Sequence, residues 1–194
     1  MKRYLREELG LRYKKLKPIT TAHNLLPAKL QRQRAAAEYI KLLSQGKTII
    51  NIDESVVNTT DDRQRGWFYP GRRNMVTHMQ RLRSLSLIVA VSSKGDFMYT
   101  VNSGKNNGQT FILFLIKLCE LLDSQDTQWR ENTVLLLDNA PYHRSKVVME
   151  KLEQLKLTIL FLGPYQFKLA PVELMFSYIK NRDLNPLKTR ALGK

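Results

Sequence analysis

The 194-residue chain has few cysteines, no long apolar runs and few acidic residues. Cys119 is its single cysteine, which excludes an internal disulfide and a zinc site built from cysteines. Its uninterrupted apolar runs span only a handful of residues, whereas a membrane-crossing helix needs about 20. We therefore expect no membrane-spanning helix and no membrane partner. The charged start, Met1-Lys2-Arg3, also predicts no secretory signal.

The shortage of acidic residues leaves the chain strongly basic. Asp and Glu number 17 against 32 Lys and Arg, which gives a formal net charge of +15. The excess is largest in residues 1–50, which hold 12 of the basic residues. Basic side chains gain affinity by displacing the counterions of phosphates, so the charge favours a nucleic acid as partner. Charge alone leaves a generic basic protein open, and it does not separate a binding protein from an enzyme.

The apolar pattern, with 43% hydrophobic residues, predicts a folded domain rather than a disordered chain. Short apolar runs predict five strands, at Thr48–Asp53, Leu85–Ser92, Phe97–Asn102, Thr133–Leu137 and Thr158–Leu162. Helical spacing predicts helices at 2–9, 27–47, 111–122, Ser145–Leu155 and Pro171–Arg182. In the helix over 27–47, the expected inward face consists of Leu30, Ala37, Ile40 and Leu43.

This order of elements predicts the fold class. A meander of three strands followed by strands that alternate with helices favours an α/β fold with a mixed five-stranded sheet flanked by helices. The ribonuclease H-like fold has this order. We expect residues 27–194 to form this domain, with a leading helix over 27–47 and a basic insertion over 54–84. Residues 1–26 are interpreted as the remnant of a helix-turn-helix DNA-binding region and a linker.

Three acidic residues stand at the ends of these predicted elements. Asp53 ends the first strand, Asp138 follows the fourth, and Glu173 opens the last helix behind Pro171. Each taken singly has an ordinary alternative as a turn former, a helix cap or a partner of the helix dipole. Together, acids at neighbouring strand ends repel, and a divalent cation removes that repulsion. Carboxylates suit Mg²⁺ or Mn²⁺, and we expect two ions, which support in-line cleavage of a phosphodiester.

Arginines dominate the polar stretch between the first two strands, where residues 63–83 contain no acid. We predict that its six arginines contact DNA phosphates, although a solvated loop is the alternative: Arg63, Arg65, Arg72, Arg73, Arg81 and Arg83. His143 and Arg144, which follow Asp138, are further candidates for contacts with DNA. For His143 a surface or capping role is an equal alternative.

Several motifs together resemble the Tc/mariner superfamily of transposases. They are Ile52-Asp53-Glu54-Ser55, Leu137-Asp138-Asn139-Ala140-Pro141-Tyr142-His143 and Pro171-Val172-Glu173. Asp138 and Glu173 are separated by 34 residues, the spacing that names one branch of this group. Before the third acid the family usually has Ser-Pro-Asp-Leu-Asn-Pro, whereas this chain reads Gln166-Phe167-Lys168-Leu169-Ala170-Pro171. Because the spacing is kept, we expect the metal site to be kept.

The resemblance implies a ribonuclease H-like catalytic domain with a catalytic and metal-binding triad of Asp53, Asp138 and Glu173. It also implies metal-dependent cleavage of double-stranded DNA at transposon ends and transfer of the freed strand to target DNA, performed by a homodimer or a larger assembly. Two alternatives stay open: a transposase-derived DNA-binding protein without activity, and another ribonuclease H-like nuclease. DNA as substrate predicts the nucleus in a eukaryote, and the nucleoid or cytoplasm in a bacterium.

Overall fold

The computed structural model describes residues 2–10, 25–57 and 84–181, and its described strands form one mixed sheet in the order β3-β2-β1-β4-β5. The strands are β1 (Thr48–Val57), β2 (Leu85–Ser92), β3 (Phe97–Ser103), β4 (Thr133–Leu137) and β5 (Ile159–Phe161). The first three pair antiparallel, whereas β4 runs parallel to both β1 and β5. Both the mixed sheet and its five strands match the sequence prediction.

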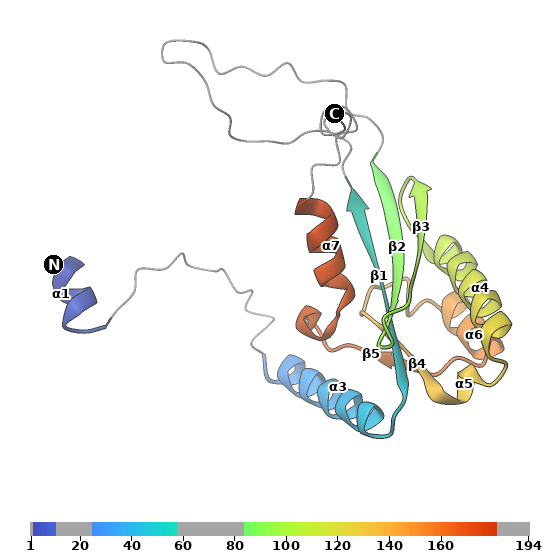
Figure 1. Ribbon diagram of the computed structural model, residues 1–194, viewed down its shortest axis with the longest axis horizontal. Helices are drawn as coiled ribbons and strands as arrows, with labels where there is room; N and C mark the ends of the chain where they lie inside the picture. Colours follow the sequence, from blue (N-terminus) through green and yellow to red (C-terminus); the bar gives the residue numbers. More distant parts are fainter. Residues whose placement is uncertain (1, 11–24, 58–83, 182–194) are drawn as a thin grey trace, which may run out of the picture.

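Helices cover both faces of this sheet (Figure 1). The helices are α1 (Lys2–Glu7), α3 (Leu26–Ser44), α4 (Gly108–Gln125), α5 (Trp129–Asn132), α6 (Lys146–Gln154) and α7 (Val172–Asn181), with a 3₁₀ turn η1 at Phe167–Leu169. Helices α4 and α6 lie on one face, while α3 and α7 lie on the other (Figure 1). The predicted arrangement of a mixed sheet flanked by helices is thus confirmed.

The face under α4 and α6 carries the larger apolar core. Phe111, Leu115 and Leu118 of α4 are fully or almost fully buried against β1, β2 and β4, on the face that their spacing predicts. Helix α4 begins at Gly108 because the side chain of Asn107 accepts hydrogen bonds from the backbone N–H groups of Gln109 and Thr110.

On the other face, α3 does not bury the residues that the sequence analysis selected. Leu30, Ile40 and Leu43 are 43–65% exposed. The helix instead turns Ala35, Tyr39 and Leu42 inward. The reason is its position at the rim of the sheet, where it packs against β5 and the loop that follows β5. A helix that covers an edge buries a narrow stripe, so its apolar pattern is a weak guide to its inner face.

Strand β1 is longer than predicted and continues through Asp53 to Val57. Its partner β4 pairs only with Thr48–Asn51. Strand β2, however, pairs with β1 as far as Val57, and this pairing maintains the strand conformation beyond Asp53. The prediction that Asp53 ends the strand was therefore wrong. Residues 54–57 belong to β1 rather than to the basic insertion. Residues 58–83 of that insertion lie outside the described residues, as do 11–24 of the predicted helix-turn-helix remnant.

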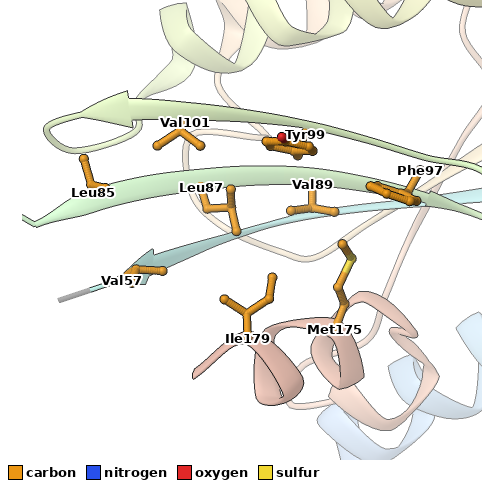
Figure 2. Close-up of a pocket in the computed structure, with 9 residues that line it drawn as sticks. All are labelled: Val57, Leu85, Leu87, Val89, Phe97, Tyr99, Val101, Met175 and Ile179. Atoms are coloured by element: carbon orange, nitrogen blue, oxygen red, sulfur yellow. The ribbon is translucent and has the colours of Figure 1, made fainter. Parts of the chain in front are cut away.

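An apolar groove of about 280 Å³ lies between α7 and strands β1, β2 and β3 (Figure 2). Leu87 and Val89 form its floor, and Met175 and Ile179 close it on the α7 side (Figure 2). None of the residues that line it is acidic, so this groove is separate from the acidic cavity described below. Among the described helices, none combines the length and the apolar character needed to cross a membrane.

Candidate active site

The three predicted acids lie around one cavity of about 360 Å³, although they come from three separate elements. Asp53 comes from β1, Asp138 follows β4 directly, and Glu173 lies in the first turn of α7. Much of the remaining lining comes from the segment between β5 and α7, including Leu162, Gln166 and Ala170. The structure therefore brings together the side chains that the sequence analysis selected.

Strand pairing explains why Asp53 and Asp138 are neighbours. In the parallel ladder, Asn51 of β1 is paired with Leu136 of β4. Asp53 and Asp138 each lie two residues beyond this pair along the chain, so continuing the same register sets the two acids side by side. Successive residues of a strand point to opposite faces, which places Asp53 on the face of Asn51. The two acids thus approach each other at the carboxyl end of β4.

Glu173 is placed by a buried residue that the sequence analysis did not select. The side chain of Asn51 is almost fully buried, and its Nδ2 donates to the carbonyl of Leu136 over 3.1 Å. Its Oδ1 accepts from the backbone N–H of Val172, also over 3.1 Å. Asn51 thereby ties the start of α7 to the centre of the sheet, one residue before Glu173. A single Asn within a run of isoleucines was the available sequence signal.

The loop between β5 and α7 is anchored to α3. A side-chain carbon at Gly163 would lie 2.7 Å from the Cα of Arg32, so only glycine fits this approach. Gln166 accepts from the backbone N–H of Gly163 over 2.8 Å and donates to the carbonyl of Arg32 over 3.0 Å. Gln166 opens the segment in which this chain departs from the Tc/mariner pattern. These hydrogen bonds hold the segment that leads into α7.

Asp53 is surrounded by other acids and resists ionisation. Burial raises the pKa of its carboxyl to about 7, and repulsion from Asp138, Glu54 and Glu173 adds to this effect against a hydrogen bond from the backbone N–H of Glu54. An Asp that resists ionisation among other acids gains from a nearby cation. The electrostatics of the cavity therefore favour a bound positive charge.

His143 occupies a different place from the one predicted. Its side chain is fully buried, with ring centroids 4.4 Å from both Phe111 and Tyr142. Nδ1 donates to Oδ1 of Asp138 over 2.8 Å, and Nε2 donates to Oε1 of Glu54 over 3.1 Å. The expected contact of its side chain with DNA is not supported, because the ring lies inside the protein. The sequence around His143, which follows the Asp-Asn-Ala-Pro stretch, gives no clear indication that this side chain is buried.

Hydrogen bonds to His143 set the charges around it. Burial by itself would lower the pKa of His143, but hydrogen bonds to Asp138 and Glu54 raise it to about 9, so the ring is positively charged. Burial would likewise raise the pKa of Asp138, but hydrogen bonds from His143 and the backbone N–H of Ala140 hold it below its usual value. Because its pKa is lowered, Asp138 is ionised. Burial, followed by the charge of Glu54, raises the pKa of Tyr142.

Arg144 is exposed beside the cavity. Its guanidinium donates to Oδ1 of Asn139 and lies 4.2 Å from the ring centroid of Phe161. Asn139 in turn donates to the carbonyl of Leu162. Arg144 is thus available at the surface next to Asp138, as a DNA contact requires. The six arginines predicted to bind DNA all lie outside the described residues.

The donor set of the cavity fits a hard divalent cation. All three acids offer carboxylate oxygens, the ligands that Mg²⁺ and Mn²⁺ prefer. Across the described ranges, no three His, Cys, Asp or Glu side chains converge into a ready-made metal cage. This does not contradict the fit, because Mg²⁺ keeps several waters and is commonly bound by one or two carboxylates together with substrate phosphates.

The family model for DDE superfamily endonucleases matches residues 48–191, and the chain belongs to this family. The match begins at β1 and includes all three acids of the cavity. It confirms the resemblance to DDE-type transposases that the sequence motifs indicate. No curated protein sequence gives a significant match.

Solved structures of one transposase share the fold. The Mos1 transposase paired-end complex with left transposon end has a TM-score of 0.68 at 21% identity, covering 98% of this chain and 60% of that chain. The Mos1 mariner paired end complex with Mn has a TM-score of 0.63 at 21% identity, covering 88% and 53%. The catalytic domain of Mos1 mariner transposase has a TM-score of 0.55 at 17% identity, covering 92% and 82%. The chain thus spans about 60% of the length of the first of these.

Proposed function

We propose that this chain is the catalytic domain of a DDE transposase, which cuts DNA at transposon ends and joins the freed strand to target DNA. The observation that carries the proposal is the meeting of Asp53, Asp138 and Glu173 around one cavity. Family membership and the net charge of +15 support it, because the substrate is a polyanion.

We infer that Asp53 and Asp138 hold a first divalent ion and that Glu173 contributes to a second. Bound ions of this kind activate the attacking water or 3′-hydroxyl and stabilise the leaving oxygen. Asp138 supplies an ionised carboxylate because His143 and Ala140 donate to it. Burial and repulsion from neighbouring acids raise the pKa of Asp53, and a cation held there would offset both effects. One of the similar Mos1 complexes is named as containing Mn and another as containing Mg.

DNA reaches this cavity, in our proposal, along basic side chains. Arg144 lies at the surface beside Asp138 and contributes a phosphate contact. Proposed contacts also come from the basic insertion, through Arg63, Arg65, Arg72, Arg73, Arg81 and Arg83. The Mos1 relatives are named as paired-end complexes, which supports a homodimer or larger assembly on DNA for this chain too. From DNA as the substrate we propose a location in the nucleus of a eukaryote, or in the nucleoid or cytoplasm of a bacterium.

A nicking assay on double-stranded DNA tests the proposal. We expect the protein to cut with Mg²⁺ or Mn²⁺ and to lose cutting with chelator. Asp53→Ala should abolish cleavage, whereas Asp96→Ala, which removes an exposed acid from the turn between β2 and β3, should cut like wild type. Binding of DNA without any cleavage would instead identify a transposase-derived binding protein. Cleavage restricted to RNA–DNA hybrids would identify a different ribonuclease H-like nuclease.

A further inference from the structure

We propose that Glu54 is a positioning residue for Asp138 and acts through the imidazole of His143. The inference rests on the proposed function, since it assigns a supporting residue to the same cavity. Glu54 follows Asp53 in β1, so the two side chains leave opposite faces of the strand. Asp53 lines the cavity, whereas Glu54 reaches His143 beneath it.

The chain of contacts runs from Glu54 to Asp138 through one ring. Glu54 Oε1 lies 3.1 Å from Nε2 of His143, and Nδ1 lies 2.8 Å from Oδ1 of Asp138. Both partners are carboxylates and therefore only accept, so the ring donates from both nitrogens. Phe111 and Tyr142 pack against the ring, which has no solvent exposure. Within this enclosure, the ring is held at one end by Glu54.

Fixing the ring fixes the carboxylate of Asp138. Oδ1 accepts from both His143 Nδ1 and the backbone N–H of Ala140, over 2.8 and 2.9 Å. Two donors on one oxygen set the rotation of the group and leave Oδ2, for which the described residues provide no hydrogen bond, as the oxygen for an ion. Outer partners of metal ligands commonly orient them in this way, and their loss typically costs about 10- to 100-fold in metal affinity.

A competing explanation is that Glu54 only compensates the charge of a buried imidazolium. Its side chain is only 12% exposed, and its charge helps to raise the pKa of nearby Tyr142, which suits a purely structural ion pair as well. The two explanations differ in what they require. Positioning requires a side chain at position 54 that is long enough to keep an accepting oxygen within hydrogen-bond distance of His143 Nε2. Compensation requires only a negative charge.

Two variants separate reach from charge. Glu54→Gln keeps the length and an accepting oxygen but removes the charge, whereas Glu54→Asp keeps the charge and is shorter by one methylene. We would measure Mn²⁺ affinity by electron paramagnetic resonance of the free ion, and the ring N–H signals of His143 by ¹⁵N–¹H spectroscopy. Asp123→Asn is the matched control, because it weakens contacts with Trp129 and Arg130 far from the cavity.

We expect Glu54→Gln to bind Mn²⁺ within about twofold of wild type and Glu54→Asp to bind about tenfold more weakly. Glu54→Asp should also lose the ordered Nδ1–H signal of the hydrogen bond to Asp138. Wild-type affinity in Glu54→Asp, with weakened binding in Glu54→Gln, would overturn the positioning role. If wild-type protein binds no Mn²⁺, the proposed function fails. The ring signals still decide the positioning role in that case, because an unchanged Nδ1–H signal in Glu54→Asp refutes it.

Discussion

Asp53 and Glu54 are consecutive residues of β1, yet they lie in opposite electrostatic surroundings. Asp53 faces a cavity that it shares with two other acids, and its pKa is raised to about 7 by burial and repulsion. Glu54 faces the interior, where it hydrogen-bonds a buried, charged His143. One face of the strand carries uncompensated negative charge, and the other carries charge that the protein itself neutralises.

The difference shows which acids are free to bind something else. A carboxylate paired with an imidazolium inside the protein is satisfied, whereas a cluster of carboxylates around a cavity gains from an added cation. Asp138, which follows β4, takes part in both surroundings: it lines the acidic cavity, and it accepts a hydrogen bond from the buried His143. Changes at Asp53, Asp138 and their supports therefore have different expected effects on activity and on stability.

The largest expected effect is that of Asp138→Asn. Removing this charge should lower metal-dependent cleavage by orders of magnitude, because it weakens ion binding. It should also destabilise the metal-free protein by about 1 kcal/mol, a value discounted because half of the side chain is solvent-exposed. The loss should be present at neutral pH and vanish as the pH falls through the lowered pKa of Asp138. Cleavage rates and urea melts in chelator measure the two effects, and a variant more stable than wild type would refute the pairing with His143.

The next effect concerns the support under Glu173. Asn51→Ala leaves the buried carbonyl of Leu136 and the buried N–H of Val172 without their partner. We expect a loss of about 2–4 kcal/mol in the free energy of unfolding, since each unsatisfied buried group costs about 1–3 kcal/mol. Denaturant titration measures the loss. A change below about 0.5 kcal/mol would show that Asn51 does not tie α7 to the sheet.

Asp53→Asn should stabilise the metal-free protein. The pKa of Asp53 is raised in the folded state from 3.8 to about 7, so ionisation costs folding stability as the pH rises through this window. Without metal, the variant should melt at a higher temperature than wild type, with a difference that grows from pH 5 to pH 7 and then levels off. Thermal melts in chelator measure this shift, which amounts to roughly 2–4 °C per kcal/mol. A difference that does not vary with pH would remove Asp53 from the repelling cluster.

The smallest expected effect on folding is that of Arg144→Ala. The guanidinium is exposed, so its contacts with Asn139 and Phe161 should contribute less than about 1 kcal/mol. Its effect on DNA affinity should be visible as a reduced salt dependence, by up to about one unit of log–log slope. Binding titrations at several salt concentrations measure this, and an unchanged slope would exclude a phosphate contact.

The sequence predicted the site best where a residue type is energetically unfavourable at its predicted position, as a carboxylate is at the end of a buried strand. Asp53, Asp138 and Glu173 were selected because acids at the ends of buried elements need a reason, and they do line one cavity. The extent of β1 beyond Asp53 was missed, because it depends on pairing with β2, a partner distant in the sequence. The inward face of α3 was missed because that helix packs at the rim of the sheet rather than across it.

The supporting residues were harder to predict, because their roles exist only in three dimensions. Nothing near His143 in the sequence shows that Glu54, 89 residues earlier, closes a hydrogen-bonded chain with Asp138. Alternation along β1 sets Glu54 on the face opposite Asp53, but it does not show which residue Glu54 contacts there. Asn51 carried a signal as a polar residue among isoleucines, yet its partner Val172 could not be inferred.

The most direct test of the account is an anomalous difference map from a crystal grown or soaked with Mn²⁺. We predict a peak between the carboxylates of Asp53 and Asp138, with a second peak within reach of Glu173 once a DNA end is bound. Glu54 should have no ion beside it, because His143 already neutralises it. A map without a peak in the acidic cavity, or with its strongest peak beside Glu54, would contradict the division of β1 into a metal-binding face and a supporting face.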